Sequence, residues 1–170
     1  SAAELIAAIK DIADFEVSAA AYPEKHPDSP SFEADMDNLK RKVDAGADRL
    51  ITQFFFEPEM FLRFRDRCDR WGIDVPLVPG IMPVFNFEKV ANFAHENDAS
   101  VPQWLYETFA GLDADPEARK MVAASVAADL CSALQQEGVN RFHFYTLNRA
   151  DLTYAICRRI GIKPELDAAA

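Results

Sequence analysis

The feature that most constrains this chain is a strand-like stretch that runs into polar residues and then into a helical segment. The pattern occurs four times, at residues 15–26, 49–59, 75–83 and 140–149. Because helical segments separate the strands, they are expected to lie parallel and to be joined by right-handed crossovers. Ligands of parallel α/β sheets bind at the carboxyl ends of the strands. The polar residues that follow each strand are therefore the first candidates for a site.

Helical periodicity fills the intervals between these strands. The first fifteen residues are amphipathic, and four glycines, Gly46, Gly72, Gly138 and Gly161, stand where helices are expected to stop. The predicted helices after the first cover residues 31–46, 58–71, 87–97, 101–109, 115–137 and 149–160.

Two architectures fit four βα units: a small, open, doubly wound sheet, or four of the eight units of a (β/α)8 barrel. A whole barrel needs about 250 residues, and this chain has 170. No internal boundary is visible, so residues 1–170 are expected to form a single domain. Half a barrel leaves two apolar strand edges open. Such edges pair with other chains, so we expect a homo-oligomer or association through these edges.

Composition excludes several classes of function. The net charge of -10 argues against non-specific binding to nucleic acid and to an anionic membrane surface. No apolar run is long enough to cross a bilayer. The three cysteines, Cys68, Cys131 and Cys157, show no CxxC spacing. Neither a metal site nor a disulfide framework is expected, and a cytoplasmic location fits best.

Polar residues after the first strand could contact a ligand. Tyr22 and His26 lie in a proline-containing loop, where they could stack on a ligand or belong to an ordinary surface loop. In the next helix, Asp35, Asn38 and Lys42 share one face because they are spaced at i, i+3 and i+7.

Arg41 flanks this face, which could hold a phosphate-bearing cofactor. The alternative is a solvated face with helix pairs such as that between Asp37 and Arg41. Spacing alone favours the solvated face.

Later strands carry further candidates. Gln53 lies in an apolar strand and must find hydrogen-bond partners, either in a neighbouring backbone group or in a substrate amide. His143 and Tyr145 alternate with Phe142 and Phe144, so the two pairs face opposite sides of the sheet. His143 is interpreted as a packed core residue rather than a catalytic base.

Arg149 stands at the carboxyl end of the last strand. There it could clamp a carboxylate or simply begin the next helix at the surface. No nucleophile elbow, P-loop, GxGxxG or HExxH motif occurs. The residues alone indicate a ligand-binding α/β unit without a visible catalytic group.

Five blocks of sequence carry a family resemblance: AAYPEKHP, DNLKRKVDAGADRLITQFFF, FLRFRDRC, VPGIMPV and FHFYTLNRA. Together, from about residue 5 to residue 164, they resemble bacterial methylenetetrahydrofolate reductase. The resemblance implies a (β/α)8 TIM barrel, of which this chain would supply strands five to eight. It also implies FAD as cofactor, NADH or NADPH as reductant, and reduction of 5,10-methylenetetrahydrofolate to 5-methyltetrahydrofolate.

The resemblance also implies roles for individual residues. It assigns FAD binding to residues at the first strand and on the following helix, namely Ala20, Tyr22, His26, Asp35, Asn38, Arg41 and Lys42. It assigns contacts with the folate or the nicotinamide dinucleotide to Gln53, Phe93, Tyr145 and Arg149, with Arg149 near the glutamate tail of the folate.

The family's first four βα units are absent from this sequence, and with them the glutamate that acts as general acid. The resemblance therefore places no catalytic residue in this chain, and we expect the chain alone to be inactive. The alternative is a non-catalytic half-barrel that binds a nucleotide or a partner chain.

Overall fold

A computed structural model describes residues 1–163; residues 164–170, the end of the predicted single domain, lie outside the described part. Helix α1 (Ala2–Ile12) precedes four strands, β1 (Ser18–Ala21), β2 (Arg49–Phe54), β3 (Leu77–Ile81) and β4 (His143–Phe144). The helices that directly follow these strands are α2 (Phe32–Asp44), α3 (Pro58–Arg70), α4 (Phe87–Glu96) and α7 (Ala150–Arg159). The enlarged connection before β4 contains α5 (Gln103–Phe109), the 3-10 helix η1 (Leu112–Ala114) and α6 (Pro116–Gln136).

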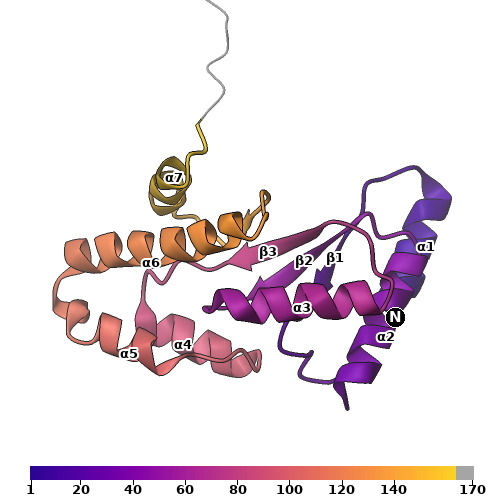
Figure 1. Ribbon diagram of the computed structural model, residues 1–170, viewed down its shortest axis with the longest axis horizontal. Coiled ribbons are helices and arrows are strands. Elements are labelled where there is room, and N and C mark those ends of the chain that lie inside the picture. Colours follow the sequence, from indigo (N-terminus) through magenta and orange to yellow (C-terminus); the bar gives the residue numbers. More distant parts are fainter. Residues whose placement is uncertain (164–170) are drawn as a thin grey trace, which may run out of the picture.

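The strands form one parallel sheet in the order β1-β2-β3-β4, and Figure 1 shows α3 lying alongside it. The parallel pairing and the alternation of strands and helices confirm the prediction from sequence. A doubly wound sheet reverses its strand order at a switch point, whereas this order follows the chain. The architecture is therefore consistent with half of a (β/α)8 barrel.

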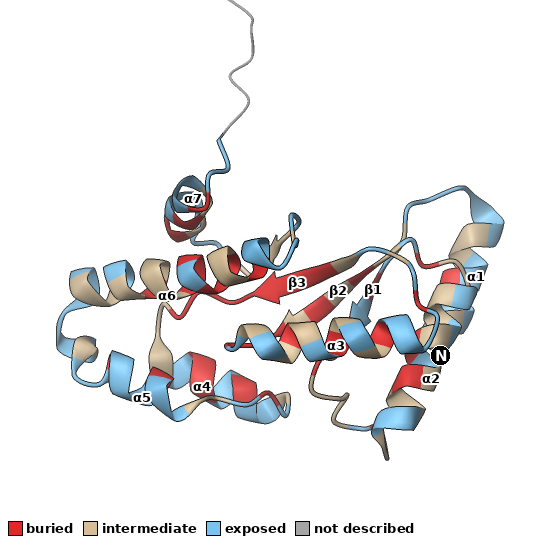
Figure 2. Ribbon diagram, in the orientation of Figure 1, coloured by how far each residue is buried: buried red, intermediate tan, exposed pale blue. Residues whose placement is uncertain are grey.

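In β1 and β2 one side of the strand is buried more deeply than the other, whereas β3 is buried at every residue after Leu77 (Figure 2). In β1, Ala19 and Ala21 are buried while Ser18 and Ala20 are exposed, as the two-residue period of a strand requires. The buried face packs on a core shared with α1, α2 and α3. A second core joins the carboxyl-end side of the sheet to α4, α5, α6 and α7. The two clusters together hold all the strands against their helices.

The prediction that helices end at glycines is confirmed. All four residues concerned adopt positive φ angles, namely Gly46, Gly72, Gly138 and Gly161. The strands are shorter than the stretches that the sequence predicts, above all the last one. Only His143 and Phe144 pair with β3.

Past the hydrogen bond from Tyr145 N to Ile81 O, Leu147 and Asn148 take φ angles of 46° and 61°. Residues with positive φ cannot continue a strand. His143 is therefore half-buried in an edge strand, not packed in the core as the sequence suggested.

Within residues 1–163, no helix combines the length and the apolar character that crossing a membrane requires.

Candidate functional site

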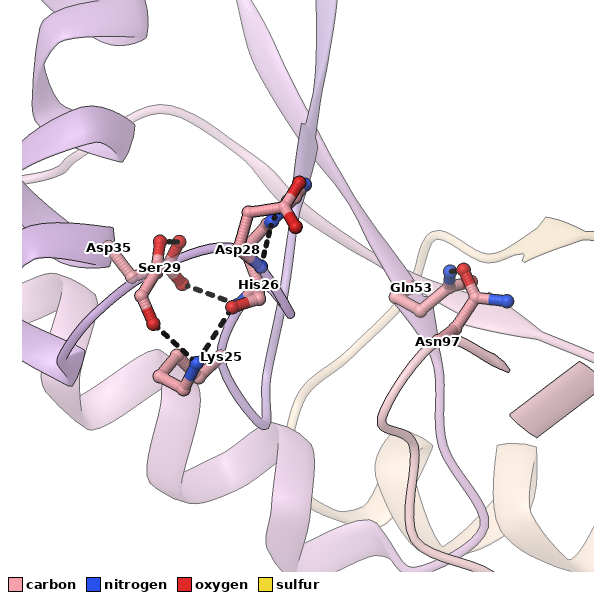
Figure 3. A network of polar contacts seen from close by, with 7 residues as sticks. All are labelled: Lys25, His26, Asp28, Ser29, Asp35, Gln53 and Asn97. Carbon is pink, nitrogen blue, oxygen red and sulfur yellow. Dashed lines mark hydrogen bonds and ion pairs between the residues drawn. The ribbon is translucent and has the colours of Figure 1, made fainter. Parts of the chain in front are cut away.

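The loop after β1 is organised by two charged side chains (Figure 3). Asp35, from the first turn of α2, accepts hydrogen bonds from Ser29 Oγ at 2.9 Å and from His26 N at 3.2 Å. Lys25 Nζ donates to the carbonyl oxygens of His26 at 2.9 Å and of Ser29 at 2.6 Å. Lys25 itself has a φ of 100°. The two side chains hold the loop against the start of α2.

Tyr22 and His26 form an aromatic pair at the end of β1. Their rings meet edge to face, with the centroids 4.5 Å apart. His26 Nδ1 accepts a hydrogen bond from Asp28 N at 3.0 Å, which fixes the ring beside the loop. The Asp28 carboxylate also approaches this nitrogen, to 3.9 Å. Burial, together with Asp35 and Asp28, raises the pKa of Tyr22 and keeps it a neutral phenol.

A hollow of about 360 Å³ lies between this loop and α2. It brings together five of the residues that the sequence analysis proposed for FAD, namely His26, Asp35, Asn38, Arg41 and Lys42. Ser1, Ala2, Ala3, Asp28, Ser29 and Pro30 complete the lining.

Lys42 crosses from α2 to β1, where its Nζ donates to the Ala20 carbonyl oxygen at 2.8 Å. Burial lowers the pKa of Lys42, and nearby Asp35 partly offsets this shift. Arg41 lines the same hollow and also pairs with Asp37, the helix pair that the solvated-face alternative predicted. With two cations and an amide, the donor set of this hollow suits a polar anion such as a diphosphate.

Gln53 lies half-buried near the end of β2, with both ends of its amide hydrogen-bonded. Its Oε1 accepts from Phe54 N at 3.1 Å, and its Nε2 donates to Asn97 Oδ1 at 3.2 Å. Tyr22 and Gln53 line the same small hollow, which lies between the loop after β1 and the end of β2. Phe93 stacks on Phe54 with the ring centroids 5.5 Å apart, and 43% of its surface is exposed.

Tyr145 reaches across the sheet from the end of β4. Its hydroxyl donates to the Thr52 carbonyl oxygen at 2.9 Å, and its ring meets Phe54 edge to face with centroids 6.3 Å apart. Burial raises the pKa of Tyr145, with a smaller contribution from Tyr22. Tyr22, Gln53, Phe93 and Tyr145 therefore surround one region at the carboxyl ends of the strands.

Arg149 lies apart from this region, at the residue before α7. Its guanidinium lies over the Phe85 ring, 4.7 Å from the centroid. A hollow of about 220 Å³ connects it to Arg119, Lys120 and Asp151 at the starts of α6 and α7. Lys120 and Asp151 pair at 2.5 Å. The carboxylate proposed for Arg149 belongs to a ligand and stays a prediction; within the chain, the guanidinium contacts an aromatic ring.

Sequence reasoning missed several residues that shape the site. Asn97 accepts a hydrogen bond from Gln53, and Ser29 donates one to Asp35. The sequence gives no signal for these two pairs, because the partners come from different segments of the chain. Thr52 could have been found, since a hydroxyl in an apolar strand needs a partner. It is fully buried, and its Oγ1 accepts from Gly80 N at 2.9 Å.

Parallel βα units in sequential order, with polar residues at the carboxyl ends of the strands, are consistent with one half of a (β/α)8 barrel. The family model described as methylenetetrahydrofolate reductase matches residues 1–161. This chain belongs to the methylenetetrahydrofolate reductase family.

Among curated relatives, it is 56% identical over 165 residues to 5,10-methylenetetrahydrofolate reductase of Pectobacterium carotovorum subsp. carotovorum, covering 97% of this chain and 55% of the relative. It is 54% identical to the Escherichia coli K12 protein of the same name, covering 97% of this chain and 56% of the relative. The chain thus spans about half the length of the relatives it matches.

A solved structure of an uncharacterized protein from Clostridium thermocellum, which binds two copies of 5-methyl-5,6,7,8-tetrahydrofolic acid, is similar in fold. Its TM-score is 0.56 at 15% identity, and the match covers 92% of this chain and 57% of that one. At this identity, the similarity supports the fold alone.

Proposed function

We propose that this chain is the flavin- and folate-binding half of a 5,10-methylenetetrahydrofolate reductase. In this proposal, residues 1–170 form one domain that contributes strands five to eight of the barrel. The complete enzyme would reduce 5,10-methylenetetrahydrofolate to 5-methyltetrahydrofolate with NADH or NADPH through FAD. The proposal rests on membership of the family, combined with the hollow that gathers His26, Asp35, Asn38, Arg41 and Lys42.

The residues around the hollow fit FAD by their chemistry. Lys42 is a partly buried cation whose pKa is lowered by burial, so an anion beside it would relieve an existing cost. Arg41 offers a second cation at the rim, and Asn38 an amide. Bound FAD would supply the hydride-carrying ring, and the protein would bind and orient it. Tyr22, as a neutral phenol, would remain able to donate a hydrogen bond.

The folate and the nicotinamide dinucleotide are proposed to bind in turn beside Gln53, Phe93 and Tyr145. An exposed Phe93 ring offers a stacking surface for a flat heterocycle. Arg149 would lie near the acidic tail of the folate, and its hollow also holds the cations of Lys120 and Arg119. The methyltetrahydrofolate bound by the Clostridium thermocellum protein is chemically the same kind of ligand.

Two carboxylates, those of Glu24 and Asp98, line the hollow beside Gln53, and Glu24 is engaged by another segment of the chain. The Glu24 oxygens accept from Ser100 N at 3.0 and 3.1 Å and from Ser100 Oγ. Both Glu24 carboxylate oxygens are thus committed to Ser100 rather than to a ligand. We therefore propose that the chain binds ligands but does not turn them over without an acid from elsewhere.

Two measurements on the same sample test this function. The chain should elute with bound FAD in gel filtration, seen as flavin absorbance under the protein peak. With FAD, NADH and menadione, it should show no turnover above a protein-free control. Flavin binding with NADH turnover would refute the inactivity of the chain, while a flavin-free protein peak would count against the cofactor assignment.

A further inference from the structure

The side-chain amides of Gln53 and Asn97 form a hydrogen-bond relay (Figure 3). The backbone group bonded at each end of the relay fixes which way the amides point. At one end, the backbone N–H of Phe54 donates to Gln53 Oε1 at 3.1 Å. At the other end, Asn97 Nδ2 donates to the carbonyl oxygen of Phe93 at 2.8 Å. A backbone N–H only donates and a carbonyl only accepts. Flipping either amide would therefore set two like groups against each other, so Asn97 fixes the orientation of Gln53.

Asn97 is itself held beside Gln53 by contacts outside the relay. It is the residue directly after α4, at its C-cap, and the following Asp98 takes a φ of 51°. Two residues further on, Ser100 is hydrogen-bonded to Glu24 in the loop after β1. The segment that carries Asn97 is thus tied to the first strand's loop as well as to α4. This double attachment lets Asn97 act as a fixed support for the Gln53 side chain.

The relay leaves part of the Gln53 amide available to a ligand. A primary amide has two N–H donors and two lone pairs on its oxygen. The bonds to Phe54 N and Asn97 Oδ1 use one of each. The remaining donor and acceptor lie in a fixed order because the amide cannot flip. Such a group matches a ligand that carries an acceptor and a donor side by side, as a cyclic amide does in the pterin ring of a folate.

We propose that Asn97 is a positioning residue that orients Gln53 for the cyclic-amide edge of the folate. The inference rests on the proposed function, in which Gln53 and Phe93 contact that ligand. Asn97 acts through Gln53, and its bond to the Phe93 carbonyl serves as the anchor.

A double-mutant cycle with 5-methyltetrahydrofolate, measured by isothermal titration calorimetry on the whole chain, tests the proposal. Asn97→Ala should weaken binding about tenfold, the effect of losing roughly one hydrogen bond. In a Gln53→Ala background, the same change should weaken binding by less than about twofold, because the residue through which Asn97 acts is gone. Asn92→Ala, an exposed position on the same helix, is the matched control and should bind as the wild type does.

Equal losses from Asn97→Ala in both backgrounds would overturn the proposal, because they would mean that Asn97 does not act through Gln53. A second readout separates this failure from failure of the proposed function. In NMR spectra of the ligand-free chain, the Gln53 side-chain NH2 signals should show contacts to Asn97 that vanish in Asn97→Ala. If the wild type shows these contacts but binds no folate, the proposed function fails and the role of Asn97 in orienting a ligand falls with it. If the contacts are absent in the wild type, the relay itself is refuted.

Discussion

Gly80 lies directly against Thr52: a Cβ atom at position 80 would lie 2.2 Å from the Thr52 carbonyl oxygen. The same carbonyl accepts the Tyr145 hydroxyl, and the ring of Tyr145 would lie 2.7 Å from that Cβ atom. The close approach lets Gly80 N donate to Thr52 Oγ1. The absence of a side chain at Gly80 therefore permits the contacts that hold Tyr145 over β2 and β3.

Gly80→Ala should destabilise the chain by about 3 kcal/mol, since backbone rather than a flexible side chain blocks the new methyl group. Gly111→Ala is the control, because Gly111 has a φ of 77° but open space around it. That change should cost only about 1 kcal/mol. Urea unfolding followed by circular dichroism measures both. Equal costs would contradict the steric account.

The order of elements and the ends of the helices could be predicted from sequence because both depend on local patterns. Apolar periodicity located α2 and α3, and glycines such as Gly46 marked where helices end. The length of β4 could not be predicted. An edge strand extends only as far as its neighbour pairs with it, and β3 pairs with His143 and Phe144 alone.

The candidate site was predicted in a different way. Helical spacing placed Asp35, Asn38 and Lys42 on one face, and all three line one hollow. Their FAD roles came from the family resemblance and stay predictions. Partners distant in sequence could not be predicted: Gln53 meets Asn97 after 44 residues, and this pairing depends on how α4 packs on the sheet.

Asp35 should matter to the fold as well as to the cofactor. Asp35→Ala removes the acceptor for both Ser29 Oγ and His26 N, so it should lower the free energy of unfolding by about 1–3 kcal/mol. Asp37→Ala, on the same helix, removes only an exposed pair with Arg41 and should cost under about 0.5 kcal/mol. Limited proteolysis should cut Asp35→Ala fastest within residues 22–31. Similar unfolding energies for the two variants would rule out this role of Asp35.

Two buried thiols make stability fall in alkaline solution. Burial raises the pKa of Cys68 and of Cys131 to about 12, from an ordinary value of 9.0. Above pH 9 the unfolded chain loses these protons while the folded chain keeps them, so rising pH favours unfolding. The slope should approach about 1.4 kcal/mol per pH unit for each thiol.

The contribution of these thiols can be isolated between pH 9 and 10. In this interval, the raised pKa values of Tyr22 and Tyr145 add a smaller loss of the same sign, because an unfolded tyrosine ionises only near pH 10. Urea unfolding of Cys68→Ala/Cys131→Ala should show a clearly flatter dependence on pH than the wild type, whatever its absolute stability. An unchanged slope would mean that other groups cause the alkaline loss.

Self-association is expected from the sheet edges. Within residues 1–163, β1 and β4 each have one neighbouring strand, so each leaves an edge unpaired. Sedimentation velocity at increasing protein concentration should show a weight-average sedimentation coefficient that rises. A concentration-independent monomer would contradict this prediction, and the edges would then have to be shielded by side chains.

Flavin fluorescence titration tests the central claim, that α2 and the loop after β1 hold FAD, most directly. The chain should quench FAD fluorescence with saturation, and Lys42→Met should weaken the affinity roughly 10- to 100-fold through loss of a charge-assisted contact. Lys40→Met removes the same charge from the same helix, where Lys40 pairs with Asp44 outside the hollow. This control should bind within about twofold of the wild type. Saturable binding that both variants weaken equally, or no binding by the wild type, would contradict the account.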